Sequence, residues 1–101
     1  MELRDLETLM HQFVGSKGWY EPDSPKPQTA RNLAASLAIE AAEVLEHFQW
    51  REEASHPEAL AGELADVALY LLQLASVTSI DLQQAILDKL AHNQTRDWPV
   101  P

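Results

Sequence analysis

The amino-acid sequence predicts an all-α fold, in which four helices form a bundle that is completed by dimerisation or tetramerisation. Two observations support this expectation. Apolar residues recur at steps of three and four along most of the chain, and no stretch of useful length alternates as a strand does. The 101 residues are enough for one domain, spanning 1–101, and a domain this small gains stability by burying further surface between copies.

The first expected helix runs from Glu2 to Val14, because its apolar side chains share one face: Leu3, Leu6, Leu9, Met10 and Phe13. The stretch from Gly15 to Gln28 then carries two glycines and three prolines. Proline lacks a backbone donor and fixes φ, so this stretch is expected to be a loop. A loop of this length in a small domain favours a functional role.

The second helix is expected to begin after Thr29, whose side chain can cap it, and to continue to about Arg51. Its apolar positions again recur at helical spacing. They are Leu33, Leu37, Ala41, Val44, Leu45 and Phe48.

Two further capping patterns mark the remaining helices. Ser55 and Glu58 have the spacing of a capping box, and the apolar repeat that follows them reaches about Val77. Asp81, with Gln84 three residues later, opens the fourth helix. Short turns between such helices are typical of a bundle.

Charge and composition exclude several classes of partner. Seven basic against sixteen acidic residues give a net charge of −9, which repels phosphate backbones and anionic lipid, so we expect neither a nucleic-acid polymer nor a membrane as partner. No segment is expected to span a membrane, and the first residues do not resemble a signal peptide. The expected location is the cytoplasm. Without cysteine, the chain has no disulfide, thiolate metal site or thiol nucleophile.

Two pairs of carboxylates stand where a core would be expected. Glu40 and Glu43 lie three positions apart on the second helix, and Glu63 and Asp66 repeat that spacing on the third. Glu40 continues the apolar stripe that contains Leu37. The row of Glu63 and Asp66 runs beside the apolar row of its own helix. Burying that apolar row therefore brings these acids to the edge of the core.

Carboxylates gathered on facing helices repel each other, and burying an unpaired charge is unfavourable. Oxygen ligands without His or Cys select hard divalent cations, with Mg²⁺ first and Mn²⁺ as the other possibility. Bundle cores are a known place for sites built from inward-facing glutamates. The alternative is that these acids form solvated helix faces, which are common in a chain with sixteen acidic residues.

The segments SLAIEAAEVLEHFQW (36–50) and GELADVALYLLQLA (62–75) resemble the MazG family of nucleoside triphosphate pyrophosphohydrolases. That family carries Glu-x-x-Glu on one helix and Glu-x-x-Asp on the next. The resemblance covers about Leu6 to Arg96, and the similar members are the short, single-domain proteins of the dCTP pyrophosphatase or integron-borne type. Further matching residues are Arg31, Asn32, Leu33, Phe48, Gln49, Trp50, Lys89 and Asn93.

The resemblance implies Mg²⁺-dependent hydrolysis of a (deoxy)nucleoside triphosphate to monophosphate and pyrophosphate, which cleans or balances the nucleotide pool. It also implies that the metal ligands are Glu40, Glu43, Glu63 and Asp66. A phosphoanhydride needs its charge neutralised and a water aligned, which a bound metal can provide. Either Glu40 or Glu43 is the expected residue that orients or deprotonates this water.

The resemblance also implies contacts to phosphate and sugar. Lys89 and Asn93 lie four positions apart on the fourth helix and so point the same way, and the matching residues of relatives touch phosphate and sugar. Arg31 and Asn32 stand at the start of the second helix, where a helix N-terminus favours anions. The alternative for Lys89 is a solvated lysine at the surface.

Aromatic residues are the candidates for base binding. Trp19 in the long loop and Trp50 after the second helix can stack on any base. Tyr70, on the row of the third helix that ends at Gln73, matches a pocket tyrosine of relatives. The alternative for all three is structural packing. Which base is preferred stays open between cytosine and adenine deoxynucleotides, which the similar relatives suggest.

The chain departs from the family pattern at two places. Ile39 stands where many MazG proteins have a further glutamate, and Trp98 stands near the C-terminus where relatives often have a tyrosine. A fifth carboxylate ligand and the contact of that tyrosine are therefore not carried over. The four histidines show no ligand spacing and are expected at the surface, and Phe13 is expected in the core.

Two other functions compete with the enzyme. One is a non-catalytic, acidic helical interaction module, in which the carboxylates are merely solvated. The other is a carboxylate-bridged iron or manganese protein, which the sequence disfavours because neither Glu43 nor Glu63 opens a Glu-x-x-His pair. The product of nucleotide hydrolysis separates all three.

Overall fold

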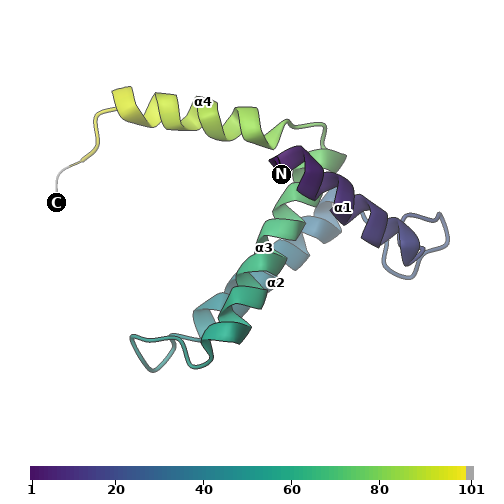
Figure 1. Cartoon of the computed structure of the whole chain (residues 1–101), viewed down its shortest axis with the longest axis horizontal. Coiled ribbons are helices and arrows are strands. Elements are labelled where there is room, and N and C mark those ends of the chain that lie inside the picture. Colours follow the sequence, from purple (N-terminus) through teal and green to yellow (C-terminus); the bar gives the residue numbers. More distant parts are fainter. Residues whose placement is uncertain (100–101) are drawn as a thin grey trace.

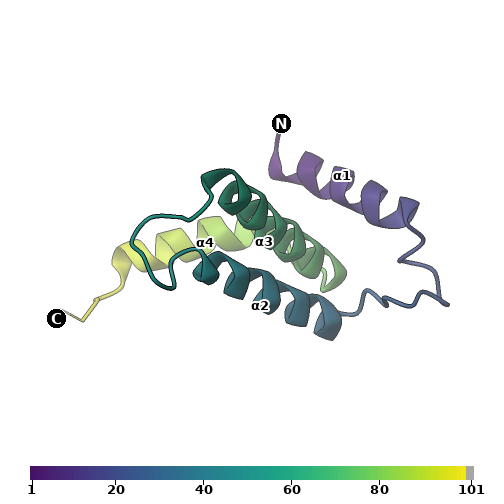
Figure 2. The same ribbon diagram turned by 90° about the horizontal axis from the view of Figure 1, so that it is seen from below.

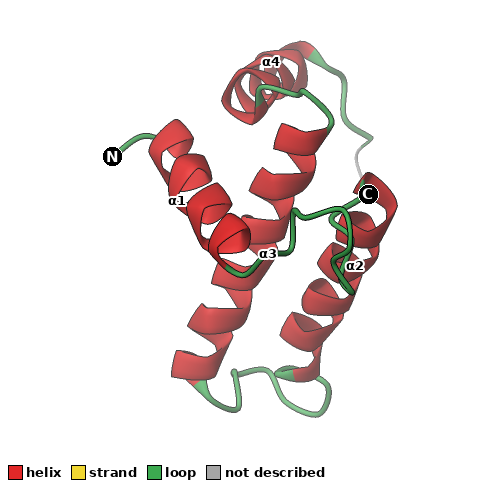
Figure 3. Cartoon of the chain, turned by 90° about the vertical axis from the view of Figure 1, so that its right-hand side faces the viewer, coloured by secondary structure: helices red, strands yellow, loops and turns green. Residues whose placement is uncertain are grey.

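The computed structural model describes residues 1–99 and contains four helices (Figure 1). No strand occurs in this part of the chain, as the colouring in Figure 3 shows, so the all-α prediction is confirmed. In chain order the helices are α1 (Leu3–Ser16), α2 (Ala30–Glu46), α3 (Pro57–Val77) and α4 (Leu82–Thr95).

The central helix of the fold is α3, which lies between α1 and α2 (Figures 2 and 3). A short connection reverses the chain after α2, so α2 and α3 run antiparallel and form the largest contact between helices. The buried apolar residues come from these three helices, and they lie where α1 and the first half of α2 meet the second half of α3. They are Met10, Val14, Leu33, Leu72 and Ala75.

Two predicted caps are present. The Thr29 hydroxyl accepts a hydrogen bond from the Asn32 amide at 3.2 Å, and the Asp81 carboxylate accepts one from the Gln84 amide at 3.0 Å. Each satisfies a backbone donor that the first turn of a helix leaves free, typically contributing about 1 kcal/mol. The starts of α2 and α4 were therefore predictable from local sequence.

The expected end of the second helix at Arg51 is wrong, because α2 ends at Glu46. The amides of His47 and Phe48 bond to carbonyls three residues back, which tightens the chain into turns. The capping box at Ser55 is also wrong. His56 is the residue before α3 and makes no side-chain cap, while the Ser55 hydroxyl lies 3.3 Å from His47 Nδ1 instead.

The fourth helix extends away from the other three, as Figure 1 shows, and none of its residues is buried. The radius of gyration is 16.3 Å, compared with about 13 Å for a compact domain of 100 residues. A single chain therefore does not close a four-helix bundle. Part of the reason is the turn before α4, where Ser79 takes a left-handed conformation with φ 61° and redirects the chain.

By length and composition α3 is long and apolar enough to cross a membrane, although the amino-acid sequence predicts no such segment. It nevertheless packs against α1, α2 and α4 and carries Glu63 and Asp66. Carboxylates inside a bilayer are costly, and the core helix of a folded domain passes the same test. The absence of a membrane partner stays a prediction.

Candidate functional site

A cavity of about 670 Å³ is lined by α1, α2 and α3, and residues of the loop from 17 to 29 form part of its wall. Its volume falls within the range of about 300 to 1,000 Å³ that is common for small-molecule sites. Most of the wall is apolar, with a few polar side chains. The residues used below are Phe13, Trp19, Lys26, Gln28, Asn32, Asp66, Tyr70 and Gln73.

Aromatic rings and a lysine form one side of this cavity. Trp19 meets Phe13 edge to face, with ring centroids 5.8 Å apart and planes at 83°. The Lys26 ammonium lies 5.1 Å from the centre of the Trp19 ring, within the range of a cation–π contact. Flat rings beside a positive charge suit a ligand that has both an aromatic base and an anionic group.

A chain of hydrogen bonds ties the loop to α3. Gln73, only 3% exposed, donates from Nε2 to Gln28 Oε1 at 2.8 Å and to the Tyr20 hydroxyl at 3.2 Å. Tyr20 in turn meets His11 of α1 at 2.5 Å. Partial burial raises the pKa of Tyr20, and the hydrogen bond from Gln73 offsets some of that rise. The phenol therefore stays protonated at neutral pH.

The carboxylates of α2 and α3 lie beside this cavity, and Asp66 belongs to both. Burial raises the pKa of Glu40, and a hydrogen bond with Glu43 and the negative charges of Glu43, Asp66 and Glu63 raise it further. Glu40 Oε2 is buried and has no hydrogen-bond partner. Glu40 therefore interacts electrostatically with the other three acids, which would not be the case if the two helix faces were solvated separately.

A divalent cation fits these residues. Within residues 1–99 no three His, Asp or Glu side chains lie close enough together to form a preformed metal site. Even so, the unpartnered Glu40 oxygen and the raised pKa are the features that a cation would relieve, and all four donors are hard oxygen ligands. The residues that could hold the ion are Glu40, Glu43, Glu63 and Asp66.

His47 joins this cluster, contrary to the expectation that all four histidines lie at the surface. It is 8% exposed, and its Nε2 bonds to Glu63 Oε2. The reason is its position: His47 follows Glu43 by four residues and so continues the acidic row of α2 toward α3. His11 is also half-buried and bonded to Tyr20 and Ser76.

Comparison with known proteins agrees with this arrangement. Residues 35–101 match the MazG-like family, and that range is more than half of the chain. The chain belongs to the MazG-like family. The fold is also similar to that of a solved pyrophosphatase of Archaeoglobus fulgidus, with a TM-score of 0.76 and 33% sequence identity over 90% of this chain and 87% of that one.

Two curated relatives extend the similarity of this MazG-like chain beyond the matched range. dCTP pyrophosphatase 1 of Bos taurus is 35% identical over 107 aligned residues, which cover 97% of this chain and 60% of that protein. The Homo sapiens protein of the same name is 32% identical over 103 residues, which cover 93% and 58%. The chain thus spans about 60% of the length of these curated relatives.

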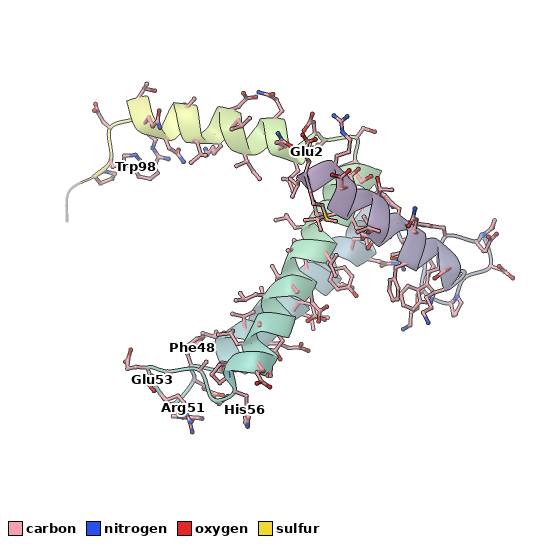
Figure 4. All side chains as sticks on the ribbon, in the orientation of Figure 1. Glu2, Phe48, Arg51, Glu53, His56 and Trp98 are labelled. Carbon is pink, nitrogen blue, oxygen red and sulfur yellow. The ribbon has the colours of Figure 1, made fainter. Side chains whose placement is uncertain are left out.

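Several residues expected to bind substrate do lie at the cavity of the MazG-like domain, namely Trp19, Asn32 and Tyr70. Arg31 is exposed and does not line the cavity. Trp50 is 88% exposed and follows Phe48 in the connection at the far end of α2 and α3, where Figure 4 labels Phe48 and Arg51. Its stacking role stays a prediction.

Lys89 and Asn93 lie on α4, which points away from the carboxylates within one chain (Figure 1). Asn93 Oδ1 is buried without a partner, while the Asn93 carbonyl accepts from Trp98 Nε1 at 3.0 Å. Figure 4 shows Trp98 at the far end of α4. The structure therefore does not bring Lys89 or Asn93 to the carboxylates of the same chain.

Sequence reasoning missed other residues of this MazG-like site. Phe13 was expected in the core, but it is 54% exposed and lines the cavity, because α1 turns that face toward the gap between α1 and α2. Gln73 ends the acidic row of α3 and hydrogen-bonds to the loop. Its polarity on an otherwise apolar stretch of α3 was the signal, whereas its partner Gln28 lies 45 residues away and gave none.

Proposed function

We propose that this chain is a nucleoside triphosphate pyrophosphohydrolase that depends on Mg²⁺ and releases monophosphate and pyrophosphate. The observation that carries the proposal is the buried, unpartnered Glu40 oxygen, which lies among three further acids beside an aromatic cavity of nucleotide size. The names of the relatives, dCTP pyrophosphatase and pyrophosphatase, support the same reaction. Such an enzyme would serve the nucleotide pool of the cytoplasm.

The carboxylates have two roles in this proposal. Glu40, Glu43, Glu63 and Asp66 hold the metal, which when bound supplies charge neutralisation for the triphosphate. Either Glu40 or Glu43 would accept the proton of the attacking water. The pKa of Glu40 is raised by burial and by its acidic neighbours, which makes that carboxylate the stronger base. Asp66 also lines the cavity, so the proposed metal site borders the proposed site of the base.

The cavity holds the nucleoside. Trp19 and Tyr70 offer flat faces to the base, and stacking of this kind contributes about 1 to 3 kcal/mol per base. Lys26, at the Trp19 ring, offers a positive charge in an otherwise acidic chain. The (deoxy)nucleotides of cytosine and adenine are the proposed substrates, in line with the name dCTP pyrophosphatase.

We further propose that the chain works as a homodimer or homotetramer. Large apolar side chains are exposed on α2, on α4 and after α2, among them Leu45, Leu87 and Trp50. Large apolar side chains left uncovered on these elements favour association with a second copy. A second copy packed on these faces would also bring α4, with Lys89 and Asn93, to a neighbouring cluster of carboxylates.

Product analysis tests the reaction. The purified protein is incubated with each nucleoside triphosphate and Mg²⁺, and nucleotide and phosphate products are separated. Monophosphate with pyrophosphate is the expected result, and it should disappear in excess chelator. Diphosphate with phosphate contradicts the proposal, and no turnover with any triphosphate favours the acidic interaction module.

A further inference from the structure

We propose that Gln73 determines base specificity, with its Oε1 accepting a hydrogen bond from an exocyclic amino group of the substrate base. This inference rests on the proposed function. Gln73 lines the cavity from α3 and is 3% exposed, so a base bound in the cavity can reach its amide while bulk water largely cannot. Three contacts fix which of its two polar atoms is free.

The orientation is set from a backbone carbonyl. A carbonyl oxygen can only accept, so the Gln28 atom that lies 2.6 Å from the Lys26 carbonyl must be the amide nitrogen. Gln28 Oε1 is therefore the atom that faces Gln73. An oxygen needs a donor, so the Gln73 atom 2.8 Å away is Nε2.

The other hydrogen of that nitrogen is also used. Gln73 Nε2 donates to the Tyr20 hydroxyl at 3.2 Å, which leaves the phenol hydrogen for His11 Nδ1 at 2.5 Å. His11 then carries its proton on Nε2 and donates to Ser76 Oγ at 2.7 Å. The contacts of Tyr20, His11 and Ser76 are compatible with this orientation of the Gln73 amide, which the Lys26 carbonyl sets through Gln28.

Gln73 Oε1 is left as an acceptor without a partner, since no residue of the described chain donates to it. A base that presents an amino group to this oxygen completes its hydrogen bonding. A base that presents a carbonyl there places two acceptors against each other and leaves both unpaired, which sites of this kind reject strongly. Amino bases such as cytosine and adenine are therefore favoured over thymine and uracil.

The test removes only the amino group of the ligand. Wild-type protein is titrated by calorimetry with cytidine monophosphate and with its 4-deamino counterpart, in which hydrogen replaces the amine. We expect the deamino ligand to bind about tenfold more weakly, which corresponds to one hydrogen bond to a well-placed acceptor. Equal affinity for the two ligands overturns the inference. This comparison needs no variant, so it does not depend on the folding of one.

Variants assign the effect to Gln73. In Gln73→Leu the two ligands should bind equally, whereas the matched change Gln83→Leu, at an exposed position of α4, should keep the preference. If Gln73 only latches the loop, Gln73→Leu weakens both ligands alike and the preference survives, which overturns the inference.

The binding preference is also separate from catalysis. If it is found in wild-type protein while no triphosphate is hydrolysed, the inference about the cavity stands and the proposed function fails. If triphosphates are hydrolysed while cytidine and deamino ligands bind equally, the proposed function stands and the inference about Gln73 fails.

Discussion

His47 at the end of α2 donates a hydrogen bond from Nε2 to Glu63 Oε2 on α3, joining the two helices that carry the carboxylates. Glu63 can only accept when ionised, so the proton lies on Nε2 and Nδ1 accepts from the Ser55 hydroxyl at 3.3 Å. One Glu63 oxygen is thereby occupied, and the other is left for a metal. Replacing a residue that orients a metal ligand in this way commonly lowers the affinity for the metal.

Replacing His47 should weaken metal binding. We expect His47→Leu to raise the Mn²⁺ dissociation constant about tenfold or more, the range found for lost outer partners of metal ligands. His47→Gln should retain most of the affinity, because the glutamine amide can still donate to Glu63. Electron paramagnetic resonance of free Mn²⁺ measures both constants. Equal loss in the two variants would mean that His47 acts through packing alone.

Removing the Glu40 charge should stabilise the metal-free protein. The pKa of Glu40 is raised on folding, so this group favours the folded state in acid, and that contribution is lost as the pH rises through its folded pKa. In chelator near neutral pH, Glu40→Gln should therefore unfold at a higher temperature than wild type. The difference should vanish in acid, where both side chains are neutral.

Thermal unfolding followed by circular dichroism checks this at about pH 7 and at about pH 3.5, below the ordinary pKa of an unfolded glutamate. Glu58→Gln is the matched control, because Glu58 is exposed in the first turn of α3 and away from the cluster. A Glu40→Gln variant less stable than wild type at neutral pH would show that the acids do not repel one another.

Much of the fold could be predicted because it is local. The Thr29 and Asp81 caps and the helical spacing of apolar residues depend on neighbours three or four positions away. The direction of α4 depends instead on the turn at Ser79 and on what covers its apolar side chains, which local spacing does not encode.

The site divides in the same way. The place of Glu40 in the site was predictable, because a carboxylate on the apolar face of a helix is either buried with that face or interrupts it. The hydrogen bonds of Gln73 were not, since they join α3 to a proline-containing loop whose path no periodic pattern specifies. His47 was misjudged because its partner Glu63 is sixteen residues away on another helix.

Loss of one ligand should abolish turnover without unfolding the helices. We expect Glu43→Gln or Asp66→Asn to lower kcat by more than about hundredfold, beyond the usual effect of an outer partner. The far-ultraviolet circular dichroism spectrum should stay unchanged, because Asp66 is exposed and Glu43 is only half-buried. Full activity in either variant would show that the replaced residue is not a metal ligand.

Truncating Trp19 should weaken substrate binding. Base stacking of about 1 to 3 kcal/mol corresponds to roughly tenfold to hundredfold in affinity, so Trp19→Ala should raise KM within that range and leave kcat less affected. Steady-state kinetics with one triphosphate gives both constants. Trp50→Ala should raise KM comparably only if another copy covers this 88% exposed side chain. An unchanged KM in Trp19→Ala would limit that residue to packing against Phe13.

Introducing a charge on the exposed apolar faces should dissociate the oligomer. Leu45 on α2 is 68% exposed and Leu87 on α4 is 52% exposed, and neither gains burial from the single chain. Light scattering after size exclusion should give a dimer or tetramer for wild type and a monomer for Leu45→Glu or Leu87→Glu, since burying an unpaired carboxylate in an interface costs several kcal/mol. Gln83→Glu adds the same charge at an exposed polar position of α4 and should leave the mass unchanged. A wild-type monomer at micromolar concentration would instead require α4 to fold back within its own chain to bring Lys89 and Asn93 to the site.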